Sequence, residues 1–361
     1  PQAVLVLTGC MPQAFPETAA ALEEADVVLG NASRRELPAR VEEYLLRHQR
    51  VVAVGEHSSR FESLQIGEFQ GRTRAFVKIE DGCNRFCSYC IIPYARGRVR
   101  SKPPEDVAHE LRALAARGFR EVVLVGINLT AYGQEWGLSI ADAVETACSV
   151  EGIERVRLGS LEPDALSEEV VRRLAAQPRL CPQFHLALQS GCDATLRRMN
   201  RKYDTARFAH SVNLLNQYFD RPAITTDLIC GFPEETEEEF AKTLAFIEKC
   251  GFAQMHIFPY SIRPGTPAEK LHQLPKKVKE DRARQVSSVA AAMRRSYLEG
   301  CVGQVYPVLF EQPRDGKFSG HAPNYMEVLV EGEGLHNVVR RVRITGTGGE
   351  ALLGELLEDA E

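Results

Sequence analysis

The apolar positions near the start of the chain form short strand-like runs separated by amphipathic stretches. Apolar runs rich in β-branched residues predict strands, and apolar residues at helical spacing predict helices. By these patterns we expect helices at 17–25 and 37–47, and strands at AVLVL, DVVLG and VVAV. Residues 1–67 therefore read as part of a small α/β domain. The polar stretch 56–71 has no clear period, and we expect it to be a linker.

From Arg74 onward, strand-like runs alternate with helix-like stretches. The six runs are AFVKIE, EVVLVGIN, RVRLGS, QFHLALQ, AITTDLICGF and MHIFPYS, and the stretches between them cover 105–117, 140–149, 167–176, 205–217 and 235–249. Such alternation predicts βαβ units and a parallel sheet. Six strands are too few for a closed barrel of eight, so residues 68–298 are expected to form an open, partial β/α barrel. A long helix at 277–299 ends this part, with Gly300 as its expected C-cap.

After Gly300 the pattern changes to short alternating runs broken by Gly, Pro and Asn. These runs are QVYPVLFEQ, GKFSGHAPN, YMEVLVEG, VVRRVRITG and ALLGELLE. Residues 299–361 are therefore expected to form a small all-β barrel, consistent with an OB-like module. The fold class predicted for the whole chain is α/β, with this barrel added at its end.

Composition and charge narrow the class of protein. The chain has 361 residues, of which 44% are hydrophobic and 26% charged, as in ordinary globular proteins. No apolar run approaches the ~20 residues needed to cross a bilayer, and the start lacks a signal-peptide pattern. We therefore expect a soluble, cytoplasmic protein with no membrane partner. The net charge of −5 does not indicate nucleic-acid binding, yet basic residues gather at 72–102 and 197–202, as either a solvated face or an RNA footprint.

Three of the ten cysteines are closely spaced. Cys83, Cys87 and Cys90 form a C-x3-C-x2-C pattern in GCNRFCSYC, directly after a predicted strand. A zinc ion would require a fourth ligand, and no nearby His or Cys supplies one, whereas a [4Fe–4S] cluster held by three thiolates keeps one iron open. The pattern favours the cluster, with zinc or three core cysteines as the alternatives. The remaining cysteines have no ligand spacing, and core packing is expected for 148, 181, 192, 230, 250 and 301.

The spacing of these cysteines, and their place after the first core strand, resemble the radical S-adenosylmethionine (SAM) superfamily. CSYCIIPYARGRVRS, VGINLTAYG, RLGSLEP, HLALQSGCDATLRRMNRKY, TTDLICGFPEETEEEF and FPYSIRPGTPA are similar to signature blocks of its methylthiotransferases. The order of the three parts is also that of this family, the last part resembling the RNA-gripping TRAM domain. Among its branches the blocks look most like the enzymes that act on N6-threonylcarbamoyladenosine in tRNA. Branches acting on isopentenyladenosine or on ribosomal protein S12 are the alternatives, as is a non-enzymatic metal–cysteine RNA-binding protein.

The resemblance implies roles for particular residues. Cys83, Cys87 and Cys90 would bind a [4Fe–4S] cluster that cleaves SAM reductively. The residues expected near the cluster or the cofactor are Phe86, Tyr89, Gly126, Asn128, Gln189, Asp227 and Gly231. Asp227 lies within a predicted strand, so it either meets a polar partner inside the barrel or contacts the ligand. The implied partners are the tRNA anticodon loop, SAM and a flavodoxin- or ferredoxin-like reductant, and the implied product carries a methylthio group at C2 of the base at position 37.

Three further expectations concern the two ends of the chain and one turn. Family members carry a second [4Fe–4S] cluster on three cysteines of the N-terminal domain, and Cys10 in VLTGCMPQ matches the last of them. We expect the other two upstream of Pro1, in a longer complete protein. Glu234 stands where the family has Gly, so its turn is expected not to need a positive φ. In the β-barrel, a basic stripe for RNA is expected from Arg340, Arg341 and Arg343 with Tyr325.

Overall fold

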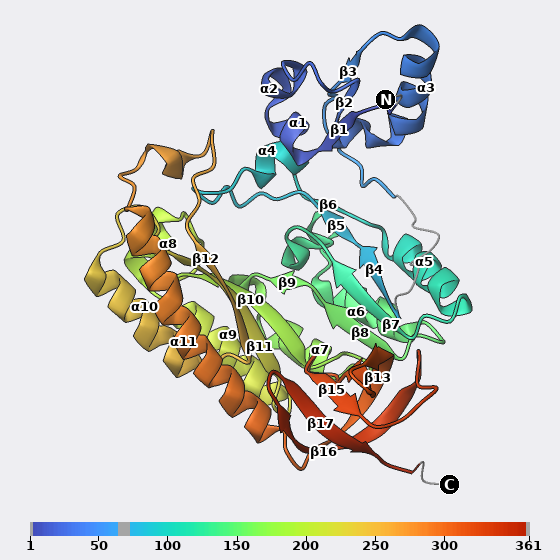
Figure 1. The fold of residues 1–361 in the computed structure, drawn as a ribbon, viewed down its shortest axis with the longest axis vertical. Helices are drawn as coiled ribbons and strands as arrows, with labels where there is room; N and C mark the ends of the chain where they lie inside the picture. Colours follow the sequence, from blue (N-terminus) through green and yellow to red (C-terminus); the bar gives the residue numbers. More distant parts are fainter. Residues whose placement is uncertain (1–2, 64–72, 359–361) are drawn as a thin grey trace.

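The computed structural model describes residues 3–63 and 73–358. The chain forms three parts in order, with the N-terminal part and the C-terminal barrel at opposite ends of the molecule and the central strands between them (Figure 1). This is the predicted architecture of a partial α/β unit, an open β/α core and a closed β-barrel.

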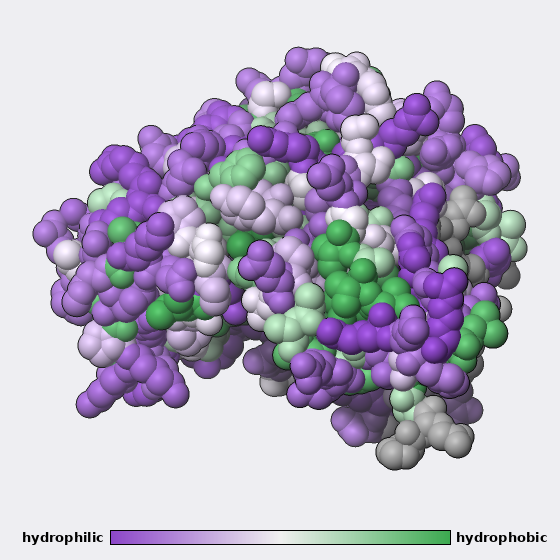
Figure 2. All heavy atoms as spheres, turned by 90° about the horizontal axis from the view of Figure 1, so that it is seen from above, coloured by the Kyte–Doolittle hydropathy of each residue, from purple (hydrophilic) through white to green (hydrophobic). Residues whose placement is uncertain are grey.

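The N-terminal part is a three-stranded parallel sheet in the order β1-β2-β3. Its strands are β1 (Val6–Gly9), β2 (Val27–Gly30) and β3 (Val51–Ala53), and its helices are α1 (Cys10–Ala14), α2 (Pro16–Ala20) and α3 (Leu37–Arg47). Helix α2 ends five residues before the predicted boundary, because the amides of Asp26 and Val27 already pair with the Leu5 carbonyl. The Arg50 guanidinium binds carbonyls at the end of α2, including that of Ala20 at 2.6 Å. Seen from above, the molecule is mostly hydrophilic, with apolar side chains in separate patches (Figure 2).

The central part contains two parallel sheets that share one continuous run of strands. The strands are β4 (Arg74–Lys78), β7 (Glu121–Val125) and β8 (Arg155–Leu158) in one sheet, and β9 (Ser160–Leu161), β10 (Gln183–Gln189), β11 (Ala223–Cys230) and β12 (Gln254–Pro259) in the other. Only Gly159 separates β8 from β9, so the strands follow one another in chain order across both sheets. The array stays open between β4 and β12, as predicted for a partial barrel. A short antiparallel ribbon of β5 (Glu80–Asp81) and β6 (Arg100–Ser101) flanks the array.

Helices cover the outer face of these strands (Figure 1). They are α5 (Pro104–Ala116), α6 (Ile140–Ser149), α7 (Glu168–Ala175), α8 (Asp193–Arg198), α9 (Thr205–Tyr218), α10 (Glu237–Cys250) and α11 (Lys276–Gly300), with α4 (Ile92–Arg96) after the cysteine loop. Capping boxes at Ser139 and Thr236 start α6 and α10. The expected glycine cap of α11 is wrong: Gly300 is the last helical residue, Cys301 follows in a right-handed conformation, and the positive φ falls at Gly303.

The C-terminal part is a closed five-stranded barrel in the order β13-β14-β15-β17-β16. Its strands are β13 (Val305–Arg314), β14 (Lys317–His321), β15 (Glu327–Val330), β16 (Val339–Gly348) and β17 (Ala351–Leu356). Alternating residues such as Val308, Phe310 and Val328 fill its interior, so the predicted small all-β barrel is confirmed. In the described part of the chain, no helix is long and apolar enough to cross a membrane.

A buried ionic cluster attaches this barrel to the lower ends of the core strands. Glu121, which is fully buried, lies 3.3, 2.7 and 3.1 Å from the Nε atoms of Arg74, Arg155 and Arg157. Arg155 donates to the carbonyls of residues 307, 321 and 322 in the barrel. Tyr325 does not join the expected basic stripe, because its hydroxyl accepts from Arg74 at 2.9 Å and its ring lies against Arg74 and Arg157.

One other sequence expectation is corrected. Glu234 has a φ of 62°, so its turn does use the left-handed region that was expected to be avoided. Its amide donates to the His272 carbonyl, which helps to hold this conformation.

The predicted linker has no helix or strand in its described residues, 56–63, and its Glu62 forms an ion pair with Arg34. The rest of that linker, residues 64–71, lies outside the described residues.

Candidate functional site

The cysteine loop lies between β5 and α4, at the upper ends of the core strands. Gly82 begins it with a φ of 91°, and a Cβ there would lie 2.0 Å from the Arg98 carbonyl, so only glycine fits. The loop is fixed from the far side of the barrel, because the Ser88 amide donates to the Met199 carbonyl at 3.0 Å and Asn200 donates to the Phe86 carbonyl at 2.8 Å. Segments more than a hundred residues apart therefore set the position of the cysteines.

The three cysteines of this loop are partly or wholly buried and receive hydrogen bonds. The amide of Arg85 donates to Cys83 Sγ at 3.4 Å, and Arg201 Nη1 donates to Cys87 Sγ at 3.2 Å. Burial, and then the nearby Cys87 and Cys90, raise the pKa of the Cys83 thiol to about 11, although the Arg85 amide opposes this. Burial also raises the pKa of Cys90. Donors aimed at sulfur suit thiolates that ligate a metal group.

The number of thiols distinguishes between the metal groups. A structural zinc site is closed by four protein ligands, and this loop supplies three, Cys83, Cys87 and Cys90, all free thiols. A [4Fe–4S] cluster held by three thiolates keeps one iron open. The three-thiol loop therefore fits a [4Fe–4S] cluster.

Arg201 is the functional residue that sequence reasoning missed. It was grouped with surface cations, but its side chain is 5% exposed and forms an ion pair with Glu162 while it donates to Cys87. Its guanidinium also lies 4.8 Å from the centre of the Tyr203 ring. No local pattern distinguishes Arg201 from its neighbours Arg197 and Arg198, because its partners come from distant parts of the chain.

A cavity of about 250 Å³ lies beside the loop and contains three of the predicted residues. Tyr89, Gln189 and Asp227 line it; the other lining residues are Ile229, Phe258, Pro259, Tyr260, Ser261 and Arg263. Gln189 has a φ of 65° at an irregularity in the pairing of β10 with β11, a feature that re-aims side chains at functional sites. The cavity is large enough for part of a nucleoside, and Tyr89 of the cysteine loop is part of its lining.

The loop of Gly126 and Asn128 does not line this cavity. It is supported from behind by Glu80, whose carboxylate accepts from the Asn128 amide at 2.7 Å. A Cβ on Gly126 would lie 2.6 Å from Glu80 Oε2, so the glycine allows this close approach. Burial raises the pKa of Glu80 to about 8, opposed by the amides it accepts from. Glu80 is a positioning residue that the sequence did not reveal.

The remaining predicted residues lie around this centre. Phe86, with a φ of 50°, packs edge-on against Tyr94 and under Arg98 rather than lining the cavity. Gly231 forms a turn with a φ of 69°, where a Cβ would lie 2.7 Å from Lys279. Neither Phe86 nor Gly231 is among the residues that line the cavity.

Cys10 begins helix α1 in the N-terminal part and is half-buried. Asn31 Nδ2 lies 3.2 Å from its sulfur and also donates to the Ala95 carbonyl in α4 at 3.0 Å. Cys10 therefore lies where the N-terminal part meets the segment that follows the cysteine loop.

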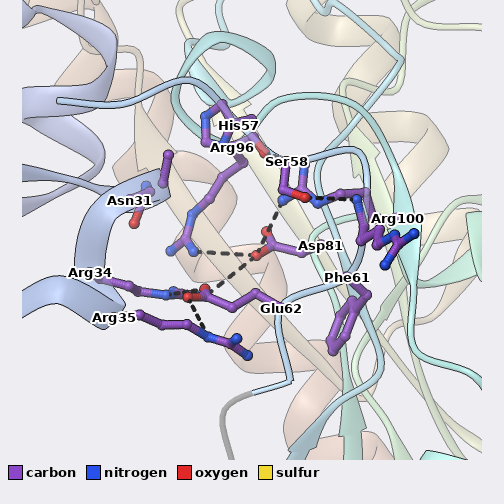
Figure 3. Close-up of a pocket in the computed structure, with 12 residues that line it drawn as sticks. Asn31, Arg34, Arg35, His57, Ser58, Phe61, Glu62, Asp81, Arg96 and Arg100 are labelled. Carbon is purple, nitrogen blue, oxygen red and sulfur yellow. Dashed lines mark hydrogen bonds and ion pairs between the residues drawn. The ribbon is translucent and has the colours of Figure 1, made fainter.

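A second cavity, of about 330 Å³, lies between the N-terminal part and the core and is lined by residues of both (Figure 3). Buried Asp81 stands at its centre, within 3.7–3.9 Å of guanidinium nitrogens of Arg34, Arg96 and Arg100. Arg34 and Arg35 also pair with Glu62 from the supposed linker. This junction ties the two parts together, and its cations outnumber its carboxylates.

Comparisons with known proteins agree with this geometry. Residues 77–247 match the family model described as the Radical SAM superfamily. The threonylcarbamoyladenosine tRNA methylthiotransferase MtaB of Aquifex aeolicus is 36% identical over 95% of this chain and 83% of its own length. The tRNA-2-methylthio-N(6)-dimethylallyladenosine synthase of Desulfitobacterium hafniense is 33% identical over 99% of this chain and 82% of its own.

Among solved structures, the cobalamin-dependent S-adenosylmethionine radical enzyme OxsB has the same fold, with a TM-score of 0.51 and 13% identity over 79% of this chain and 43% of that chain. Fold, cysteine loop and sequence identity lead to one conclusion. This chain belongs to the methylthiotransferase family of the radical SAM superfamily.

Proposed function

We propose that this protein attaches a methylthio group to C2 of N6-threonylcarbamoyladenosine at position 37 of tRNA. The observation that carries the proposal is the three-thiol loop whose Tyr89 lines the cavity together with Gln189 and Asp227, in a chain 36% identical to an enzyme named for that substrate. The dimethylallyladenosine relative makes the isopentenyl-modified base the second candidate substrate.

The residues divide the work as follows. Cys83, Cys87 and Cys90 would hold the [4Fe–4S] cluster, which with SAM supplies one-electron chemistry for an unactivated C–H bond. Arg201 places positive charge and a hydrogen-bond donor at Cys87, and Glu162 fixes the direction of Arg201. The side chains that line the cavity would orient cofactor and base against each other.

Other parts of the proposal concern regions away from the cavity. Gly126 and Asn128, supported by Glu80, would receive the amino-acid end of SAM, as the family resemblance implies. Cys10 would be one ligand of a second cluster, as the family resemblance implies. The C-terminal barrel would grip the tRNA near its anticodon loop, and a flavodoxin- or ferredoxin-like protein in the cytoplasm would supply electrons.

Complementation of a bacterial strain that lacks this modification tests the proposal. The full-length gene should restore the 2-methylthio-threonylcarbamoyl nucleoside in tRNA digests measured by mass spectrometry. Cys87→Ala should abolish the product while tRNA binding persists. Cys250→Ala, at the end of α10 away from the loop, is the matched control and should keep activity. Appearance of only the 2-methylthio-isopentenyl nucleoside would assign the second candidate, and product formation by Cys87→Ala would refute a catalytic role for the loop.

A further inference from the structure

Three polar side chains, one of which lines the cavity, lie together on neighbouring strands. His185, Asp227 and His256, here called the inner triad, come from β10, β11 and β12, and their ligand-type atoms lie within 4.8 Å of one another. Asp227 and His256 are direct register partners. His185 Nε2 lies 3.2 Å from the Asp227 carboxylate, and its Nδ1 lies 3.0 Å from the Thr225 hydroxyl.

Strand alternation shows that the inner triad faces the inside of the barrel. Leu186, Leu228 and Ile257 are the next residues along the same three strands, and they pack into the core under the helices. Because successive side chains point to opposite faces of a strand, the inner triad points away from that core. Two residues beyond Asp227 and His256, Ile229 and Phe258 line the cavity. The inner triad therefore faces the barrel interior, where Asp227 itself lines the cavity and its neighbours His185 and His256 lie against it.

Two donors at this place have no protein acceptor. His256 is exposed, its ring centre lies 5.8 Å from that of His185, and its ring nitrogens form no hydrogen bond within the described part of the chain. Arg263 lines the cavity, and its guanidinium pairs with no carboxylate in the described part of the chain. By contrast, Arg201 and Arg85 around the cysteine loop are each paired with a carboxylate. Donors left without partners in a concave site are available to a ligand.

We propose that the inner triad and Arg263 form the subsite for the N6 substituent of the adenine, and that they select a polar, carboxylate-bearing substituent over an aliphatic one. This inference rests on the proposed function. A threonylcarbamoyl group offers a carboxylate and carbonyl to His256 and Arg263, and an N–H and a hydroxyl to Asp227. An isopentenyl group would desolvate the same side chains and pair with none of them. Sites built to bind polar substrate groups reject analogues that lack them by large factors.

The test uses reconstituted enzyme under anaerobic conditions with two tRNAs, one carrying threonylcarbamoyladenosine and the other isopentenyladenosine at position 37. His256→Leu should raise KM for the first tRNA by about 10- to 100-fold, the effect of one or two lost hydrogen bonds. The preference of this variant for the first tRNA over the second, measured as the ratio of the two kcat/KM values, should fall by the same factor. His256→Gln keeps a donor and should recover part of the preference. Arg263→Gln should behave like His256→Leu, and His109→Leu, exposed on α5, should change nothing.

Iron content is a readout that substrate selection does not affect, and it should stay at the wild-type level in each variant. The inference is overturned if His256→Leu and Arg263→Gln keep the wild-type preference. It is also overturned if the wild-type protein binds one Zn²⁺ beyond its iron and loses it with His256→Leu, since two His and one Asp are also a metal donor set. If the wild-type enzyme modifies neither tRNA, the proposed function itself is refuted. That result differs from a loss of substrate preference, which concerns the inner triad alone.

Discussion

Replacing Glu121 by glutamine removes the carboxylate that faces three arginine side chains beneath the parallel strands. The carboxylate is fully buried, and Arg74, Arg155 and Arg157 surround it at 2.7–3.3 Å. Two of these arginines also donate to barrel carbonyls between residues 307 and 323. Glu121→Gln leaves Arg155 and Arg157 buried without a counter-charge at the contact between core and barrel, whereas Arg74 keeps its ion pair with Glu311.

The expected cost follows from the pKa of Glu121. Burial opposes its ionisation, but Arg157, Arg155 and Arg74 outweigh that effect and lower the pKa from 4.5 to about 2. At about 1.4 kcal/mol per pH unit, this difference corresponds to roughly 3 kcal/mol. Breaking buried ion pairs from one side costs a similar 3–5 kcal/mol or so. Because the folded pKa is lowered, the contribution is complete above pH 4.5 and is lost as the pH falls through about 2. The variant should therefore be destabilised at neutral pH.

Hydrogen exchange followed by mass spectrometry measures this loss of stability in the barrel segment that contacts the core. In Glu121→Gln at pH 7, exchange of the barrel segment 320–326 should rise by about two orders of magnitude if the segment opens by detachment from the core. Glu154→Gln is the matched control, because Glu154 pairs with Arg120 at 3.0 Å on the surface and should cost under ~1 kcal/mol. Equal exchange in the two variants would refute the idea that Glu121 holds the barrel.

Three further predictions concern the site. Gly126→Ala should lower stability by roughly 1–3 kcal/mol and weaken SAM binding, because its Cβ would lie 2.6 Å from Glu80; calorimetry and SAM titration measure both, and Gly300→Ala, whose methyl meets no atom within 4 Å, should leave SAM binding unchanged. Arg201→Gln should lower the free energy of unfolding by roughly 3 kcal/mol, because it leaves Glu162 unpaired. It should also shift the reduction potential of the cluster to more negative values in a redox titration, and an unchanged potential would contradict the role of Arg201 at the thiols. Iron loading should strengthen from pH 7 to pH 8.5, because the raised pKa of Cys83 requires a proton to leave on ligation; equal iron content at limiting iron would contradict this.

The elements that the sequence predicted well are those with a strong local pattern. Strand β10 at 183–189 and helices α3 and α6 begin and end at the predicted residues, because their apolar periods run to their boundaries. The three cysteines lie on one loop, as their spacing implied, and their role as cluster ligands stays a prediction. In both cases the pattern that makes the prediction lies within a short segment of the sequence.

Features that depend on distant partners could not be read in this way. Arg201 was indistinguishable from nearby surface cations until Glu162 and Cys87 were seen against it. Tyr325 was expected on an RNA-facing stripe because sequence shows neighbours along the chain, whereas its contacts are with Arg74 and Arg157. The positive φ of Glu234 was missed for the same reason, since tertiary contacts hold a conformation that the residue type disfavours.

The register of the parallel strands β4, β7 and β8 explains why the cysteine loop and the attachment of the barrel lie at opposite ends of the core. Glu121 is the direct partner of Arg74 on one side and Arg155 on the other, which gathers the ionic cluster at the lower ends of β4, β7 and β8. Because these strands are parallel, the same register brings their opposite ends together, where β7 leads into the loop of Gly126. In parallel β/α folds, residues at the carboxyl ends carry chemistry and those at the amino ends carry stability. Glu121→Gln should therefore release the barrel yet leave iron binding intact, while Cys87→Ala should do the reverse.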